Sequence, residues 1–218
     1  MSDSVKRGYA SPLRTAQAQA TRRRIVGAAA DLFVASGFAG TSVDAIAEAA
    51  GVSRKTVFAT VGGKTELLGL ALDWAVAGDD APVPLAARPE VVALLELPHP
   101  GAVLDGWAAV LTDIDARVDG LFAALECAAA SDEAARALFE QVSAQRREGA
   151  RAIVGAVAGL GGLRADLSRS EAIDVAALFT EPVLHRRLVG ARGWSRRRFE
   201  RWLASTLRRQ LLSRPDSR

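Results

Sequence analysis

A short stretch near position 55 carries the side chains best suited to chemistry in this 218-residue sequence. Ser53, Arg54, Lys55, Thr56 and Phe58 place hydroxyls, two cations and an aromatic ring close together. Such residues donate to phosphate oxygens and base edges, and an aromatic ring can contact a thymine methyl group. Their types and spacing favour nucleic-acid binding.

The residues that enzymes use most often are few and scattered. Cys127 is the single cysteine, and His99 and His185 are the two histidines. They suggest neither a catalytic triad nor a metal site, and Gly63-Lys64-Thr65 lacks the glycine five residues earlier that a phosphate-binding P-loop needs. We therefore expect no catalytic residues, no metal and no cofactor. A lone cysteine is also typical of a reducing compartment.

Positive charge is concentrated at the start of the chain. Residues 1–64 hold nine Lys and Arg against four Asp and Glu, a balance of +5; the whole chain has +3, so the remainder carries −2. Lys and Arg gain affinity for phosphates by releasing condensed counterions, so the first third is expected to meet a polyanion. The longest uncharged apolar run, 152–163, is shorter than the ~20 residues that span a bilayer. The sequence predicts a soluble cytoplasmic protein with no membrane contact.

Two short helices joined by a glycine turn must position these side chains. Ala47 lies where the helix backbones would touch, Gly51 can adopt positive φ at the turn, and Ile46, Val52 and Val57 supply apolar inner faces. This pattern predicts a helix-turn-helix whose second helix is free to enter a major groove.

A generic helical hairpin would show the same crossing pattern. Two flanking features favour DNA binding instead. The basic run Arg22–Arg24 lies in the preceding helix, and Lys64 opens the following one, where the helix dipole disfavours a cation unless an anion is near. A DNA phosphate would supply that anion.

Helical periodicity runs through nearly the whole chain, whereas the alternation typical of strands is missing. We expect an all-α protein: a three-helix helix-turn-helix DNA-binding domain followed by a larger helical ligand-binding and dimerisation domain. The expected divisions are a partly disordered N-terminal arm (1–20), the DNA-binding domain (21–65), a connecting helix (66–78) and the effector-binding and dimerisation domain (79–218). The expected helices span about 16–37, 41–50, 53–60, 64–77, 89–97, 101–129, 131–157, 168 to an interruption at 182, and 195–212, with Thr41, Ser53, Ser131, Ser168 and Ser195 as N-caps.

Residues 22–68 resemble the TetR family of bacterial transcriptional regulators. The resemblance is carried by Arg22 through Phe33, Gly37-Phe38, Thr41-Ser42, Ile46-Ala47, Ala50 through Ser53, Thr56-Val57-Phe58 and Lys64 through Leu68. The segment 178–184, with Arg192 through Ser195 and Trp202-Leu203, also resembles a carboxy-terminal pattern of these regulators. The resemblance implies an all-helical homodimer that binds double-stranded operator DNA and holds a small-molecule inducer in its body.

The same resemblance assigns the DNA contacts. It places Thr41, Ser42 and Lys64 on the phosphate backbone and residues 53–56 on the bases, with Arg14 and Arg22–Arg24 adding backbone or minor-groove contacts. The sequence departs from the family at Phe58, Thr60 and Val61, where the family has a tyrosine, a histidine or aromatic residue, and a phenylalanine. Phe58 keeps the ring without the hydroxyl, and Thr60 can still donate one. The DNA-binding candidates are Arg22, Thr41, Ser42, Ser53, Arg54, Lys55, Thr56, Phe58, Thr60 and Lys64.

No motif marks an effector pocket, so its candidates rest on residue type alone. A pocket is lined by apolar residues with a few polar ones, and the same side chains also fit an ordinary core. The ligand-binding candidates are Trp107, Leu111, Phe122, Glu126, Cys127, Phe139 and Phe179.

The last two helices are the expected homodimer interface. One face of the final helix carries Phe199, Trp202, Leu203, Thr206, Leu207 and Gln210, and a stripe around Ala172, Val175, Ala176 and Phe179 precedes it. A helix-turn-helix dimer reads half-sites ~34–36 Å apart, so a roughly palindromic operator is expected.

Three functions are compatible with these patterns. The favoured one is a repressor released from its operator by a small molecule of unknown identity. The second is a DNA-binding activator or architectural protein without an inducer, and the third is a helical enzyme or lipid-binding module that merely retains the hairpin.

Overall fold

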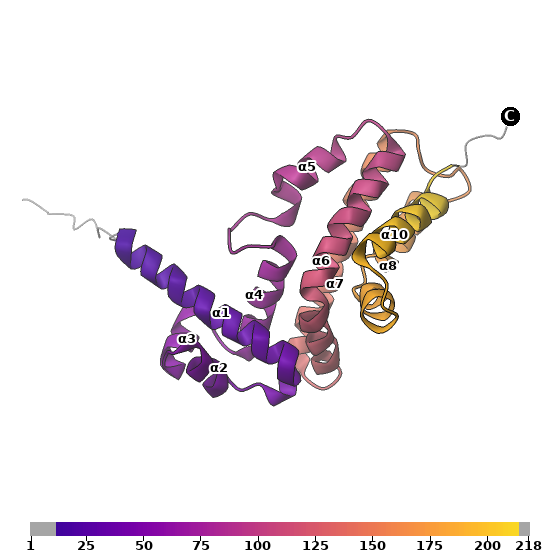
Figure 1. Cartoon of the computed structure of the whole chain (residues 1–218). Coiled ribbons are helices and arrows are strands. Elements are labelled where there is room, and N and C mark those ends of the chain that lie inside the picture. Colours follow the sequence, from indigo (N-terminus) through magenta and orange to yellow (C-terminus); the bar gives the residue numbers. More distant parts are fainter. Residues whose placement is uncertain (1–11, 214–218) are drawn as a thin grey trace, which may run out of the picture. The chain divides into compact units, whose positions relative to one another are not determined.

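The computed structural model describes residues 12–213 (Figure 1). Within this range the chain is helical, and its β-structure is limited to an isolated bridge between Leu163 and Leu212. The all-α prediction is therefore confirmed. The chain forms two compact units, Met1–Ala71 and Leu72–Arg218, divided inside the connecting helix expected over 66–78. Of the arm expected over 1–20, residues 1–11 lie outside the described range and residues 12–20 are helical.

The amino-terminal unit contains α1 (Pro12–Gly40), α2 (Val43–Ala50), α3 (Arg54–Thr60) and the first half of α4 (Lys64–Ala77). Helix α1 begins four residues before the predicted start, and its regular part ends at Gly37, as predicted, where φ is 69°. Phe33 and Phe38 stack with ring centroids 5.9 Å apart. The other buried apolar residues of this unit are Ile25, Val26, Ala29, Ile46, Ala47, Ala50, Val57, Leu67, Leu68 and Ala71.

The carboxy-terminal unit is built on two long helices. α6 (Pro100–Ala129) lies alongside α7 (Glu133–Gly159), with α10 (Arg196–Leu211) packed on α6 and α8 (Arg169–Leu178) packed on α7 (Figure 1). The shorter elements are η1 (Leu85–Ala87), α5 (Pro89–Leu95), α9 (Val183–His185) and a π-helical segment η2 (Arg186–Ala191). Residues 78–84, between α4 and η1, have no helix or strand.

Side-chain caps begin α7, α8 and α10. Ser168 and Glu171 form the predicted capping box of α8, and Ser195 caps α10 as predicted. The predicted cap at Ser131 is wrong, because the Asp132 carboxylate accepts the Ala135 N–H at 2.8 Å and starts α7 one residue later. Helix α8 ends at Leu178, before the expected interruption at Pro182.

Part of the expected dimer face is instead the core of the subunit. Phe199, Leu203 and Leu207 are fully buried within one chain, because this stripe of α10 packs against α6. Along α8, Ala172 and Ala176 are buried in the same core. The residues of the two stripes that keep exposed surface are Val175, Phe179, Trp202, Thr206 and Gln210. None of the helices within residues 12–213 is long and apolar enough to cross a membrane.

Candidate nucleic-acid interface

The turn between α2 and α3 is fixed by backbone bonds and two serine caps. Gly51 has φ 64° and ψ 40°, and the N–H groups of Gly51 and Val52 donate to the carbonyls of Glu48 (3.0 Å) and Ala47 (2.9 Å). This is the Schellman pattern that ends a helix at a left-handed glycine. The Ser53 hydroxyl then accepts the Thr56 N–H at 3.1 Å and starts α3, as predicted.

Thr41 does not cap α2, so that prediction is corrected. Ser42 performs this role, with its hydroxyl accepting the Ala45 N–H at 3.1 Å. Thr41 is buried, and its hydroxyl lies 2.8 Å from the Gly37 carbonyl and 3.1 Å from the Leu32 carbonyl of α1. A phosphate contact by the Thr41 hydroxyl would have to replace these bonds, whereas Ser42 is exposed.

Helix α3 presents the predicted side chains on its outer face. Val57 is fully buried and anchors the inner face, while Arg54, Lys55 and Phe58 are exposed, with Phe58 at 46%. Thr56 is half-buried and its hydroxyl bonds to that of Ser53 at 2.8 Å. The half-buried Thr60 ends the helix. The geometry leaves Arg54, Lys55 and Phe58 accessible to a ligand.

Arg54 already has a partner within the domain. Its guanidinium lies 2.5 Å from the Asp44 carboxylate of α2, and its central carbon lies 5.5 Å from the centroid of the Phe58 ring. Both charged side chains are more than half exposed, at 57% and 65%. Exposed ion pairs contribute only about 0.2–1 kcal/mol, so DNA can compete for the guanidinium. The sequence did not indicate this contact.

Lys64 also has an internal partner that the sequence did not reveal. Its Nζ donates to the Phe38 carbonyl at 2.9 Å and lies 4.0 Å from the centroid of the Phe38 ring. The carbonyl and the ring face supply the negative partner that a cation at a helix N-terminus requires. Lys64 therefore joins α4 to the end of α1, and a phosphate contact would be additional to this role.

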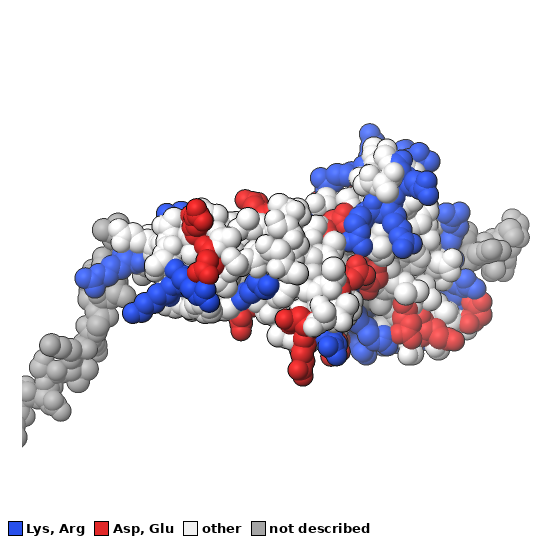
Figure 2. Space-filling view, turned by 90° about the horizontal axis from the view of Figure 1, so that it is seen from below, with Lys and Arg blue, Asp and Glu red and all other residues white. Residues whose placement is uncertain are grey.

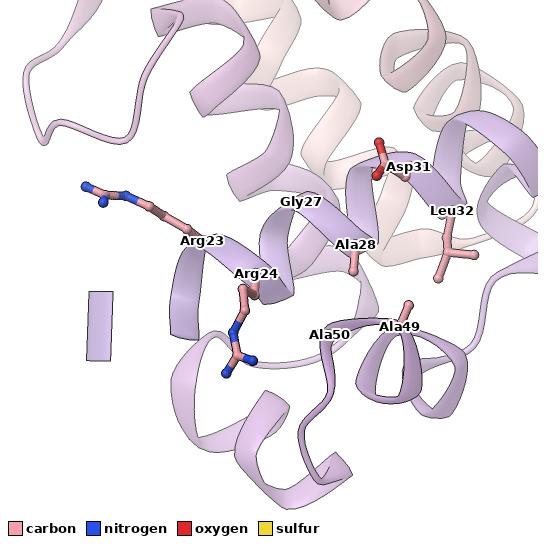
Figure 3. Close-up of a pocket in the computed structure, with 8 residues that line it drawn as sticks. All are labelled: Arg23, Arg24, Gly27, Ala28, Asp31, Leu32, Ala49 and Ala50. Atoms are coloured by element: carbon pink, nitrogen blue, oxygen red, sulfur yellow. The ribbon is translucent and has the colours of Figure 1, made fainter. Parts of the chain in front are cut away.

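The basic run on α1 lies beside the turn. Arg22, Arg23 and Arg24 are exposed, and a β-carbon on Gly51 would lie 3.9 Å from Nη1 of Arg24. An open hollow of about 430 Å³ separates α1 from α2 at this point. Figure 3 shows Leu32 and Ala28 on one side of it, Ala49 on the other and Arg24 pointing toward the turn; Gly27, Asp31 and Ala50 complete its lining.

The comparisons with known proteins agree with this geometry. Residues 25–71 match the sequence model described as bacterial regulatory proteins of the tetR family. This unit is a TetR-family DNA-binding domain. The chain is accordingly a DNA-binding transcriptional regulator. Among curated protein sequences, none matches the chain.

Solved TetR-type structures share the fold of the chain. NalD from Pseudomonas aeruginosa, described as the secondary repressor of the MexAB-OprM multidrug efflux pump, superimposes with a TM-score of 0.67 at 19% identity, over 89% of this chain and 98% of NalD. A TetR-family protein from Rhodococcus gives 0.67 at 16%, over 87% and 97%. A transcriptional regulator from Saccharomonospora viridis, solved in complex with choline, gives 0.64 at 18%, over 88% and 98%.

The seven effector candidates have different environments in the carboxy-terminal unit. Trp107 and Leu111 belong to the core, and Phe179 packs partly buried against it. Phe122 and Phe139 pair with ring centroids 5.6 Å apart. Cys127 is exposed, and Glu126 accepts from Arg186 at 3.1 Å. A second hollow is lined by Arg187, Leu188, Ala191 and Arg192, which are not among the candidates.

Sequence reasoning missed a buried polar cluster in the carboxy-terminal unit. Asp115 is 1% exposed, and burial, reinforced by the nearby Asp119 carboxylate, raises the pKa of Asp115 to about 8. Burial likewise lowers the pKa of His185 and of Arg146. Asp119 pairs with Arg186 at 3.4 Å. The i and i+4 spacing of the two aspartates was the one signal that the sequence offered.

Charge on the outside of the molecule is mixed. Figure 2 shows Lys and Arg interspersed with Asp and Glu on one face, with one dense group of basic side chains on the carboxy-terminal unit. Several arginines there are paired: Arg196 bonds to Asp113 and Arg186 to two carboxylates. Within residues 12–213, no three His, Cys, Asp or Glu side chains are grouped to hold a metal ion.

Proposed function

We propose that the protein is a homodimeric repressor that binds a roughly palindromic operator through α3 and leaves it when a small-molecule effector binds the carboxy-terminal unit. The observation that carries the DNA-binding part is the outer face of α3. Its backbone is held by Ser53, Gly51 and buried Val57, while Arg54 and Lys55 remain exposed. A rigid element with exposed donors is what base recognition in a major groove needs.

Effector release is supported by the division of the chain into two compact units. The carboxy-terminal unit is a separate compact body, and a relative with the same fold was solved with choline bound. The pairing of two chains is supported by the apolar surface that α8 leaves uncovered, where Leu178 is 66% exposed. Two copies of α3 at a fixed separation require such a pairing.

Footprinting of the purified protein on the DNA upstream of its own gene tests the proposal. We expect protection of two half-sites about one DNA turn apart, and loss of protection when the correct effector is added. Absence of a sequence-specific footprint would refute DNA-binding repression. A footprint that persists in every effector tested would favour the activator or architectural alternative.

Substitutions on α3 separate base contacts from general attraction. Arg54→Ala and Lys55→Ala are expected to weaken operator binding by roughly 1–3 kcal/mol and to reduce discrimination against altered half-sites, because base contacts carry specificity. Arg151→Ala is the charge-matched control, since Arg151 is exposed on α7 and pairs with Glu148. Equal losses in all three variants would show that Arg54 and Lys55 act only through net charge.

A further inference from the structure

Unpaired polar atoms gather at one place inside the carboxy-terminal unit. Among the described residues, buried side-chain atoms without a hydrogen-bond partner are Oδ2 of Asp115, Nε and Nη1 of Arg146, both ring nitrogens of His185, and Nε of Arg88. The Arg88 guanidinium is otherwise held by Asp79 through two bonds of 2.6 and 2.7 Å. The remaining five atoms belong to three residues of one polar cluster.

The cluster lies between α6, α7 and the segment from Thr180 to Arg186. Arg146 of α7 stacks on the Phe122 ring of α6, with its central carbon 4.2 Å from the centroid. One of its nitrogens, Nη2, bonds to Glu181 at 3.1 Å and to Ser143 at 3.2 Å. Nε and Nη1 are left as unused donors, and Oδ2 of Asp115, whose charge acts on Arg146, is an unused acceptor.

Exposure rises steadily from the centre of the cluster to its edge. Asp115 is 1% exposed, whereas the side chains of Asp119, Arg186 and Glu126 are 24%, 33% and 50% exposed. Arg186 spans the outer part, with Nη1 3.4 Å from Asp119 and Nη2 3.1 Å from Glu126. These two bonds are long or partly solvated, so displacing the Arg186 guanidinium costs little.

The charge of the cluster favours a cation. Asp119, Glu126 and Glu181 supply three carboxylates against the guanidiniums of Arg146 and Arg186, while Asp115 and His185 are held toward their neutral forms by burial. The excess is therefore negative even before Asp115 ionises. An ammonium group beside Asp115 would return its carboxyl to the charged form and satisfy Oδ2.

A purely structural ion network would have its atoms paired. A buried polar atom left without a partner costs about 1–3 kcal/mol, and native structures contain few of them. Five such atoms on three residues of one cluster are better explained by a molecule that pairs with them. The paired Phe122 and Phe139 rings, tilted by 34° to each other, provide an apolar wall next to Arg146.

We infer that this cluster is the effector site and that the effector is a small primary amine carrying an apolar body and an oxygen acceptor. Its ammonium donates to Oδ2 of Asp115, its oxygen accepts from Arg146, and its apolar part lies against Phe122 and Phe139. Arg186 moves aside to admit it. This inference rests on the proposed function, because it names the ligand class for the effector-responsive unit.

Three probes that share one skeleton and differ in charge test the inference. Tyramine carries an ammonium, tyrosol a hydroxyl and 4-hydroxyphenylacetate a carboxylate. In calorimetric titrations of the full-length protein at pH 7, tyramine is expected to bind at least about tenfold more tightly than the other two, since the single difference is a charge facing Asp115. Equal or tighter binding of tyrosol or 4-hydroxyphenylacetate, or no binding of any probe, would overturn the inference.

Substitutions on α6 locate the site. Asp115→Asn keeps the side-chain shape and is expected to reduce tyramine affinity at least about tenfold. Asp113→Asn is the matched control, because Asp113 is exposed on the same helix and pairs with Arg196. Tyramine binding to the Asp115→Asn variant that equals binding to the wild type would overturn the inference. Helical circular dichroism of both variants verifies that they are folded.

Operator footprints show whether a negative result refutes the amine site or the proposed repressor function. If another compound releases the operator equally well from wild type and the Asp115→Asn variant, repression with effector release stands and the assignment of this site fails. If tyramine binds through Asp115 but the protein shows no specific footprint, the site stands as an amine site and the repressor proposal fails.

Discussion

Asp115 is expected to make the folded protein less stable as pH rises, and Asp115→Asn is expected to abolish that dependence. The pKa of this carboxyl is about 8 in the folded chain, against an ordinary value of 3.8, because of burial and the neighbouring Asp119. Between these two values the folded state retains a proton that the unfolded state has released. Stability from this group is therefore fully present below about pH 4, and it declines until about pH 8.

The slope of this decline follows from the size of the pKa difference. Each pH unit inside the window changes the free energy of unfolding by about 1.4 kcal/mol for one proton. Between pH 5 and pH 7 the wild type should therefore lose about 2–3 kcal/mol relative to the Asp115→Asn variant. Above about pH 8 the difference between the two proteins should become constant.

Urea unfolding followed by tryptophan fluorescence measures the free energy of unfolding of the carboxy-terminal unit. All four tryptophans, at positions 74, 107, 194 and 202, belong to Leu72–Arg218. Taking the difference between wild type and variant at each pH, at one fixed protein concentration, cancels titrations that the two proteins share. The exposed Asp113 serves as the control position for an Asn substitution. A wild-type minus variant difference that is the same at pH 5 and pH 7 would refute the reasoning.

Three further substitutions test other contacts. Lys64→Met is expected to reduce the stability of the amino-terminal unit by about 1–2 kcal/mol, because it removes both contacts to Phe38. Amide hydrogen exchange in α1–α4 measures this loss. Unchanged exchange with a lower salt dependence of operator binding would mean that Lys64 acts on DNA alone. Arg117 donates to two carbonyls near the end of α4, at 2.6 and 3.0 Å. Arg117→Met is therefore expected to raise the effector concentration needed for operator release by about fivefold, while operator affinity stays within about twofold. An unchanged release curve would exclude that contact from the response. Leu178→Glu is expected to weaken self-association about tenfold in sedimentation experiments. Leu160→Glu is the control, because Leu160 is 42% exposed and lies outside α8 and α10, and it should leave self-association unchanged. Equal effects of the two substitutions would contradict the assigned interface.

Local signals accounted for most of the amino-terminal unit. Gly51, Ser53 and Lys64 mark the ends of their helices because a positive φ, a hydroxyl acceptor or a periodic apolar pattern acts over only a few residues. Thr41 was misassigned because adjacent Thr and Ser are both good caps. The choice depended on carbonyls of α1, nine and four residues earlier, that accept the Thr41 hydroxyl.

The contacts that define the candidate sites were mostly beyond the reach of sequence patterns. Arg54 and Asp44 are ten positions apart, Lys64 and the Phe38 carbonyl twenty-six, and Arg186 and Asp119 sixty-seven. Each pairing depends on how whole helices pack, for which a single sequence carries no periodic signal. The apolar stripe of α10 showed the same limit, because it predicted a buried face without specifying whether the same chain or a second copy covers it.

Helix α6 links these observations, because its inward side changes character partway along. Leu104, Trp107 and Leu111 face the apolar core, whereas Asp115 is just as deeply buried and leaves a carboxylate oxygen unpaired. Replacing that carboxyl by an apolar side chain of similar volume would remove a cost of about 1–3 kcal/mol. Destabilising buried titratable groups of this kind occur chiefly at functional sites. Arg117 lies two residues after Asp115 on α6 and donates hydrogen bonds to two carbonyls near the end of α4. A ligand at Asp115 would therefore lie on a helix that is hydrogen-bonded to α4, the helix that begins in the amino-terminal unit.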